Sequence, residues 1–244
     1  MASSHRILSF AFILLAFAPL SSRAGAPDQA TLERGAAAYA RYCVSCHGVE
    51  GDGRGIAAEG LDPRPRDFTD GRYKFRTTPP TELPTDADIL RTLDRGLHHT
   101  SMPNWKGVSQ RELRQIVAYL KTLSPRFGKE AQGTPIRVPP RPDLTPALVA
   151  KGKEVWAKAQ CATCHGDAGK GNGPVAKALR DAWGDPVLPR DLTSGPIKAG
   201  AAPEDIYVAV MAGLAGSPMP SFASSLSPEE AWALVAYVKS LRKM

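Results

Sequence analysis

A five-residue motif, Cys-x-x-Cys-His, occurs twice in this chain and uses all four of its cysteines. The first copy spans residues 43–47 and the second spans residues 161–165. On a helical turn, positions i, i+3 and i+4 lie on one face. Each copy therefore presents two thiols and one imidazole on the same side of a short helix, so the fold must provide a binding surface against that side twice.

This spacing is typical of a c-type haem attachment site. The two thiols can each form a thioether with one vinyl group of the haem, and the adjacent histidine then reaches the iron. The candidate residues are Cys43, Cys46 and His47 in the first copy and Cys161, Cys164 and His165 in the second. Methionine is the usual second axial ligand in cytochromes c.

Three other interpretations of a Cys-x-x-Cys pair were weighed: a dithiol redox motif, half of a zinc site and a plain disulfide. A redox dithiol is expected within a βαβ pattern, which the sequence does not suggest. A shared Cys₄ zinc site would have to join pairs that lie 118 residues apart. None of the three explains why a histidine follows both pairs directly.

With these motifs the chain resembles the class I c-type cytochromes, and specifically a di-haem member. The resemblance covers nearly all of the chain after its N-terminal segment. It implies an all-α fold of two tandem cytochrome c-like helical domains, each around one covalent haem c. It also implies that the first and last helices of each domain cross at a glycine and aromatic residues.

The N-terminal segment indicates export. His5 and Arg6 precede an apolar run over residues 7–20, which is short for a membrane span. A small-residue cleavage pattern follows at residues 22–24, so residues 1–24 are interpreted as a signal peptide and the protein as periplasmic. The alternative is an uncleaved anchor. No integral membrane segment is expected after cleavage.

The net charge of +7 does not indicate a nucleic-acid partner, because no block of Lys and Arg stands out. Without Arg6 and Arg23 the chain carries 29 basic and 24 acidic residues. Two haems would add four propionates and bring the total charge close to neutral. We therefore expect redox proteins, and no nucleic acid, as partners.

Each half of the chain begins and ends with a similar helix. The first is expected over residues 30–43, where Gly35 and Tyr39 share a face. Gly152 and Trp156 stand in the same relation in the second half. The closing helices, residues 109–123 and 227–241, each start with a serine three residues before a glutamate. That pattern predicts a capping box at both helices.

Two shorter segments are also repeated after each motif. The glycine-rich stretches 51–55 and 169–173 predict tight turns, since no strand or Gly-Lys-Ser/Thr sequence accompanies them. Pro-Arg-Asp then follows, with Arg66 in the first half and Arg190 in the second. One interpretation makes each arginine the partner of a haem propionate, which guanidinium can bind bidentately. An Arg–Asp surface pair or a turn-fixing contact is the alternative.

Met102 and Met219 are the candidate distal ligands of the iron. Each lies in a loop and precedes a proline, and they are 117 residues apart, nearly the separation of the two motifs. Met211 lies in an apolar helical pattern and fits a core role better. His98 or His99 is the alternative to Met102 as ligand.

Five prolines in residues 128–146 predict an extended, semi-rigid connector. The expected organisation is a signal peptide (1–24), a cytochrome c domain (25–128), a linker (129–146) and a second cytochrome c domain (147–244). The expected function is electron transfer between a protein donor and a protein acceptor, without catalysis. The alternatives are a cytochrome subunit of a larger membrane or molybdenum oxidoreductase, which would dock to a membrane complex, and a di-haem peroxidase.

Overall fold

The computed structural model describes residues 26–242, and this part of the chain is helical. It contains two isolated β-bridges, Leu83 with Gln132 and Arg180 with Pro186, and no strand. The all-α expectation is therefore confirmed for the described residues. None of the helices in this range is long and apolar enough to cross a membrane. The expected signal peptide lies outside the described residues.

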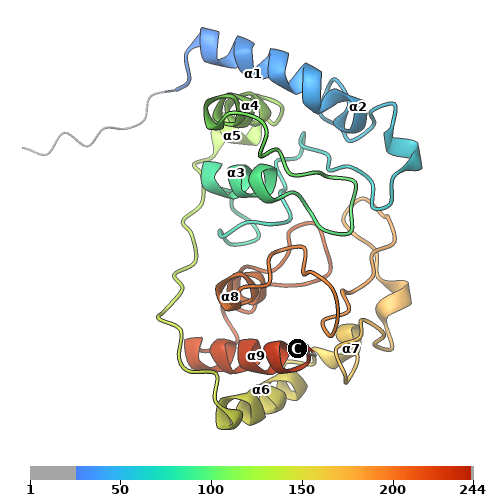
Figure 1. Cartoon of the computed structure of the whole chain (residues 1–244), viewed down its shortest axis with the longest axis vertical. Coiled ribbons are helices and arrows are strands. Elements are labelled where there is room, and N and C mark those ends of the chain that lie inside the picture. The colour runs from blue at the N-terminus through green and yellow to red at the C-terminus, as the bar shows by residue number, and fades with distance from the viewer. Residues whose placement is uncertain (1–25, 243–244) are drawn as a thin grey trace, which may run out of the picture.

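The helices form two groups, which occupy the upper and lower halves of Figure 1. The first group consists of α1 (Gln29–Tyr42), α2 (Val44–His47), η1 (Ala58–Gly60), α3 (Asp86–Arg95), α4 (Gln110–Thr122) and α5 (Arg126–Lys129). The second consists of α6 (Pro146–Lys158), α7 (Ala162–His165), η2 (Ala176–Ala178), α8 (Pro203–Ala212) and α9 (Pro228–Ser240). The order of elements is the same in both groups, except that α5 has no counterpart.

Side-chain caps define where the long helices begin. The hydroxyl of Ser109 accepts a hydrogen bond from the Glu112 N–H, and that of Ser227 accepts one from the Glu230 N–H, both at 3.2 Å. Only α9 completes the predicted capping box, because Glu230 also accepts from the Ser227 N–H at 2.9 Å. In α4 the box stays open, and the Glu112 carboxylate lies 3.9 Å from Arg41 on α1. The expectation of two capping boxes is thus half right.

The first and last helices of each group pack closely at a glycine. A Cβ atom on Gly35 would lie 2.9 Å from Cβ of Tyr119, and one on Gly152 would lie 2.8 Å from Cβ of Tyr237. Aromatic rings flank both crossings: Tyr39 and Tyr119 have ring centroids 5.3 Å apart, and Trp156 and Tyr237 are 5.6 Å apart. The crossing implied by the resemblance is confirmed in both groups.

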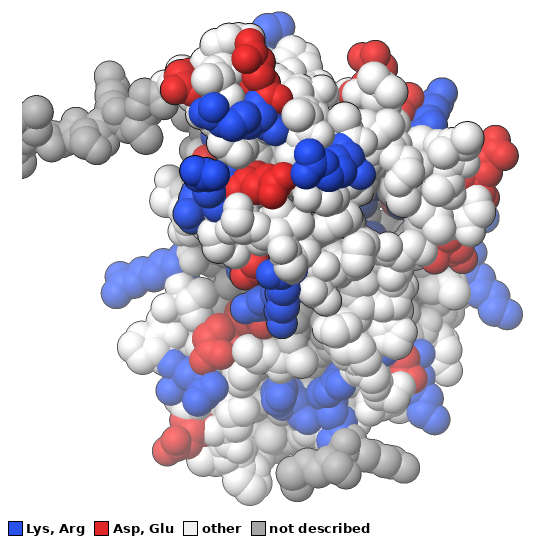
Figure 2. Space-filling model, turned by 45° about the horizontal axis from the view of Figure 1, so that its top comes forward, with Lys and Arg blue, Asp and Glu red and all other residues white. Residues whose placement is uncertain are grey.

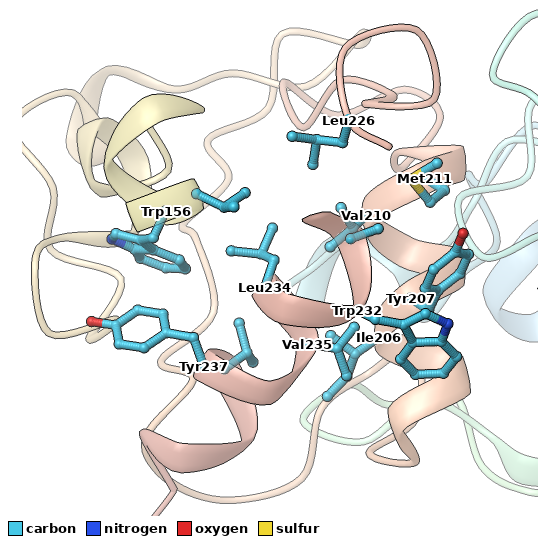
Figure 3. Packing of buried hydrophobic residues seen from close by; sticks show 13 residues of the cluster. Trp156, Ile206, Tyr207, Val210, Met211, Leu226, Trp232, Leu234, Val235 and Tyr237 are labelled. Atoms are coloured by element: carbon cyan, nitrogen blue, oxygen red, sulfur yellow. The ribbon is translucent and has the colours of Figure 1, made fainter. Parts of the chain in front are cut away.

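The core of the second group is built mainly from α6, α8 and α9, and Figure 3 shows its side chains. Tyr207 packs on Trp232 with ring centroids 4.8 Å apart. Met211 is buried in this cluster, which confirms the core role expected for it. The corresponding core of the first group includes Cys43 and has Met102 and Trp105 packed against it.

The segment between the two groups contacts both of them. The Gly133 N–H donates to the Leu83 carbonyl at 2.9 Å, and the Ile136 N–H donates to the Thr77 carbonyl at 2.8 Å. Ile136 and Val138 then pack against the core of the second group. The connector, which runs along the left edge of Figure 1, is therefore held by both groups over residues 133–138 and is not a free tether there.

Direct contacts also join the two groups. Arg95 Nη1 donates to both carboxylate oxygens of Asp205 at 3.2 Å. The Arg66 guanidinium lies over the ring of Trp183, 4.0 Å from its centroid. Over the face seen in Figure 2, basic and acidic side chains are interspersed and form no continuous block of one sign.

Candidate functional site

Both cysteine–histidine motifs fold into a single helical turn directly after a long helix. The His47 N–H donates to the Cys43 carbonyl at 2.8 Å, and the His165 N–H donates to the Cys161 carbonyl at 2.9 Å. These i→i−4 bonds place the first cysteine and the histidine of each motif on one face of the turn, with the second cysteine beside them. The structure thus brings together the three side chains of each motif as expected.

The first cysteine of each motif lies in surroundings that do not favour a thiolate. Burial raises the pKa of Cys43 to about 12 and that of Cys161 to about 11. Reactive dithiols need a lowered thiol pKa, so a redox dithiol does not fit. Within residues 26–242 no three His, Cys, Asp or Glu side chains gather as a metal cluster, so the shared zinc site does not fit either.

The imidazole of His47 is oriented by a backbone carbonyl. Its Nδ1 lies 2.9 Å from the carbonyl oxygen of Arg66, so Nδ1–H donates and Nε2 remains available as a ligand. Burial lowers the pKa of His47 and favours the neutral form that binds metals. The ring also stacks on Phe68, with centroids 4.4 Å apart. Position, tautomer and charge therefore all suit an iron ligand.

His165 is placed in the same way but is held less tightly. Burial lowers its pKa, and the backbone of Arg190 partly opposes that shift. Its buried Nδ1 faces that backbone without a well-formed hydrogen bond. The ring packs on Trp156, with centroids 5.9 Å apart. Both Pro-Arg-Asp segments thus run past the histidine of their own motif.

The glycine-rich segments wrap closely around the motif turns. The Gly53 N–H donates to the His47 carbonyl at 2.9 Å, and the Gly171 N–H donates to the His165 carbonyl at 2.8 Å. Both glycines have positive φ, 77° and 74°, a conformation open to glycine without strain. The prediction of tight turns is confirmed, and these turns support the carbonyl end of each motif.

The two methionine loops have one geometry. The Leu97 N–H donates to the Met102 carbonyl at 3.0 Å, and the Leu214 N–H donates to the Met219 carbonyl at 3.1 Å. A hydroxyl closes each loop from inside: Thr100 donates to the Leu97 carbonyl and Ser217 to the Leu214 carbonyl, both at 2.7 Å. Two segments 117 residues apart in the sequence thus build the same loop.

Each methionine packs against the cluster that contains or borders its own motif. Met102 packs against the first core together with the buried Cys43, and Met219 packs against the second core, as does Cys161. His98 and His99 are exposed, whereas Met102 is half-buried. The side chain of His99 reaches the other group of helices, with Nε2 3.0 Å from Nη2 of Arg190.

The two Pro-Arg-Asp segments form turns through their aspartates. Asp67 accepts from the N–H and hydroxyl of Thr69 at 2.7 and 2.6 Å, and Asp191 accepts from Thr193 in the same way. Neither aspartate pairs with its neighbouring arginine, so the carboxylate fixes the turn and the guanidinium is free to reach elsewhere. The Arg–Asp surface pair considered from the sequence is not formed.

Several buried polar atoms near the motifs have no partner among residues 26–242. They are the Tyr73 hydroxyl, Nε1 of Trp105 and Nε of Arg190. A buried N–H or O–H without an acceptor is costly. A bound haem would bring carboxylates that accept hydrogen bonds and an apolar ring, and Met102 and Trp105 border the first core, to which Cys43 also belongs. The residues present therefore fit a covalent haem in each group.

Two features of the site are not apparent from the residue pattern alone. The backbone carbonyl of Arg66 carries no sequence signal, although the repeat of Pro-Arg-Asp after each motif marks the segment. Trp183 has no counterpart in the first half of the chain, so the repeat offers no hint that it would meet Arg66.

Comparison with known proteins agrees with this geometry. The family model described as "Cytochrome C oxidase, cbb3-type, subunit III" matches twice, over residues 30–120 and 147–238. Among curated proteins, the cbb3-type cytochrome c oxidase subunit FixP of Azorhizobium caulinodans is 28% identical over 230 residues. That match covers 93% of this chain and 66% of FixP, so the chain spans slightly less than two thirds of that relative.

A solved structure is also similar. A chain of the reducing HAO-like protein complex of Kuenenia stuttgartiensis is 40% identical and superposes with a TM-score of 0.85. The match covers 86% of this chain and 96% of that one. The similarity therefore extends over both groups of helices and includes how they are arranged.

Proposed function

We propose that this chain, which belongs to the family of cytochrome c oxidase cbb3-type subunit III, relays electrons between redox proteins through two covalently bound haem c groups. The observation that carries the proposal is a duplicated set of residues suited to hold a haem, and each copy is called a haem seat. A motif turn, an oriented histidine, a glycine turn and a methionine loop recur in the same order in both groups of helices. A bound haem supplies reversible one-electron chemistry at its iron.

The chain's own residues have separate roles in holding these groups. We assign thioether attachment to Cys43 and Cys46 in the first domain and to Cys161 and Cys164 in the second. His47 and His165 are the proximal ligands, because their Nδ1 atoms face the backbone of Arg66 and Arg190. Met102 and Met219 are the distal ligands, supported by their matched loops. A methionine ligand raises the reduction potential.

We propose the division of the chain that the sequence suggests. Residues 25–128 and 147–244 form the two cytochrome c domains, and residues 129–146 form the linker. The linker's hydrogen bonds to the first domain and its apolar contacts with the second hold the two seats in one arrangement. Electrons can then enter at one domain and leave at the other without dissociation of the domains.

Export to the periplasm is part of the proposal, since cytochrome c relatives are typically exported and the sequence begins with a signal-like segment. The named relatives are subunits of redox complexes. We therefore propose that protein partners donate and accept the electrons, and that this chain docks to a complex at a membrane. Arg66 and Arg190 are proposed to face haem propionates.

The ligand assignment is tested by the long-wavelength iron–sulfur absorption band of the ferric protein. Met102→Leu and Met219→Leu should each remove about half of the band, because leucine preserves volume but cannot bind iron. Met211→Leu is the matched control, since Met211 is buried in the second core. If Met102→Leu leaves the band unchanged, His98 or His99 becomes the candidate ligand.

The role as a carrier, as opposed to a di-haem peroxidase, is tested by mixing the reduced protein with peroxide. Methionine ligation would fill the sixth position of each iron, so we expect no peroxide turnover. Stopped-flow reduction by a small donor should give an exchange between the two haems that is independent of protein concentration. Peroxide consumption at an enzymatic rate would overturn the carrier assignment.

A further inference from the structure

Basic side chains from both domains gather at the seam between them. Arg66 and Lys74 come from the first domain, and Arg190 and Lys198 come from the second. The positive charge of Lys74 is destabilised by that of Arg66 and of Lys198, and the charge of Lys198 by that of Arg190. The four side chains are half-buried and form a series that crosses from one domain to the other. We call these four residues the seam cluster.

The seam cluster is poorly compensated by the protein. In the part of the chain that the structure describes, the guanidinium of Arg66 and the amines of Lys74 and Lys198 make no hydrogen bond or ion pair. Arg66 instead stacks on Trp183. Arg190 Nη2 contacts His99 and donates to the Ser194 carbonyl, but its Nε is buried without a partner.

The carboxylates close to the seam cluster are already engaged or only partly offset its charge. Asp70 is bound by Arg72 at 2.9 Å, and Asp181 accepts from the N–H groups of Trp183 and Asp185. The negative charge of Asp62 stabilises the charged form of Lys198, although the two side chains make no hydrogen bond. Burial, followed by the charge of Arg66, lowers the pKa of Lys74 to about 8. Because the nearby carboxylates compensate these half-buried cations only in part, an added anion would stabilise them.

The two haem seats lie next to this seam through the backbone. The carbonyl of Arg66 orients His47, and the backbone of Arg190 faces His165. The backbone of each seam arginine thus faces a proximal histidine, whereas its side chain reaches the other domain. Arg66 contacts Trp183, and Arg190 contacts His99. The carboxylates of a haem held at either seat would be anions of the kind that this cluster lacks.

We propose that the seam cluster is one shared seat for the carboxylates of both haems, and not two private seats. The proposal rests on the proposed function and adds Lys74 and Lys198 to the residues that act on the haems. Each cation then compensates carboxylates from both domains, so its removal takes positive charge away from the surroundings of both irons. The ferric form carries one positive charge more at each iron than the ferrous form. The ferric form therefore becomes relatively favoured at both irons, and both potentials fall.

The experiment uses the full chain with both haems. Lys74→Gln and Lys198→Gln each remove one seam charge, while Lys153→Gln removes an exposed charge on α6 as the matched control. A potentiometric titration followed by absorbance is resolved into two one-electron components. Met102→His and Met219→His assign each component to its domain, because replacing a methionine ligand lowers the potential of that haem.

A shared seat predicts that Lys74→Gln lowers both midpoint potentials and that Lys198→Gln also lowers both, relative to Lys153→Gln. Shifts confined to the domain of the substituted lysine would overturn the proposal in favour of private seats. Potentials equal to those of Lys153→Gln would overturn it as well. If neither Met→His substitution moves a component, the proposed ligands are wrong, and this result is distinguishable from failure of the shared seat.

Discussion

The close approach of α6 and α9 allows a sharp test of the fold through Gly152→Ala. The added methyl would lie 2.6 Å from the carbonyl carbon of Ala233 and 2.8 Å from Cβ of Tyr237. Nonbonded carbon atoms prefer about 3.5–4.0 Å, so the two helices must separate by roughly 1 Å. The obstacle is backbone and a Cβ atom, neither of which can rotate away.

The expected cost follows from two opposing effects. Overpacking a tight contact costs about 1–3 kcal/mol and occasionally more, and the rigid neighbours place this case at the upper end. Alanine is favoured over glycine inside a helix by about 1 kcal/mol. The net destabilisation is therefore about 2 kcal/mol, which lowers the Tm of a domain of this size by roughly 8–16 °C.

The assay is thermal unfolding of the haem-loaded protein followed by far-ultraviolet circular dichroism. Gly128→Ala is the matched control, because Gly128 lies in α5 and a Cβ there meets nothing within 4 Å. Gly35→Ala should repeat the loss in the first domain, where a methyl would lie 2.8 Å from the Gln115 carbonyl carbon. Equal melting of Gly152→Ala and Gly128→Ala would refute the argument from helix contact.

Three further predictions concern other contacts. Asp88→Ala should lower the free energy of unfolding by about 3 kcal/mol in urea titrations, because this buried carboxylate accepts from the Thr77 and Thr85 N–H groups; an unchanged urea midpoint would contradict it. Hydrogen bonds from Lys158 and the Ser227 N–H lower the pKa of Glu230, so its stabilisation is present above pH 4.5 and is lost as the pH falls through the lowered value; Glu230→Gln should flatten that part of a Tm–pH profile, and a parallel profile would count against the contact. Trp183→Ala should speed proteolysis of residues 132–138, since the ring joins the domains, whereas equal cleavage of Trp183→Ala and Trp183→Phe would show that the aromatic face is not needed.

Much of this protein is determined by local sequence. The two motifs, the glycine turns and the methionine loops recur at matched spacing, and each depends on hydrogen bonds within a short segment. The apolar faces and caps of the long helices are equally local. This is why the all-α fold and the presence of two covalent haems could be predicted from the sequence. The capping box expected at α4 is not formed, and the Glu112 carboxylate instead lies 3.9 Å from Arg41 on α1.

Only the tertiary structure decided how the two domains meet. The Arg66 carbonyl orients His47 from 19 residues away, and the Arg66 side chain reaches Trp183 in the other domain. Arg190 crosses in the opposite direction to His99. Such contacts leave no periodic pattern, because they depend on where two loops arrive after the helices have packed. The two haem-attachment motifs can therefore be recognised in the sequence, whereas the contacts between the two domains exist only in the folded chain.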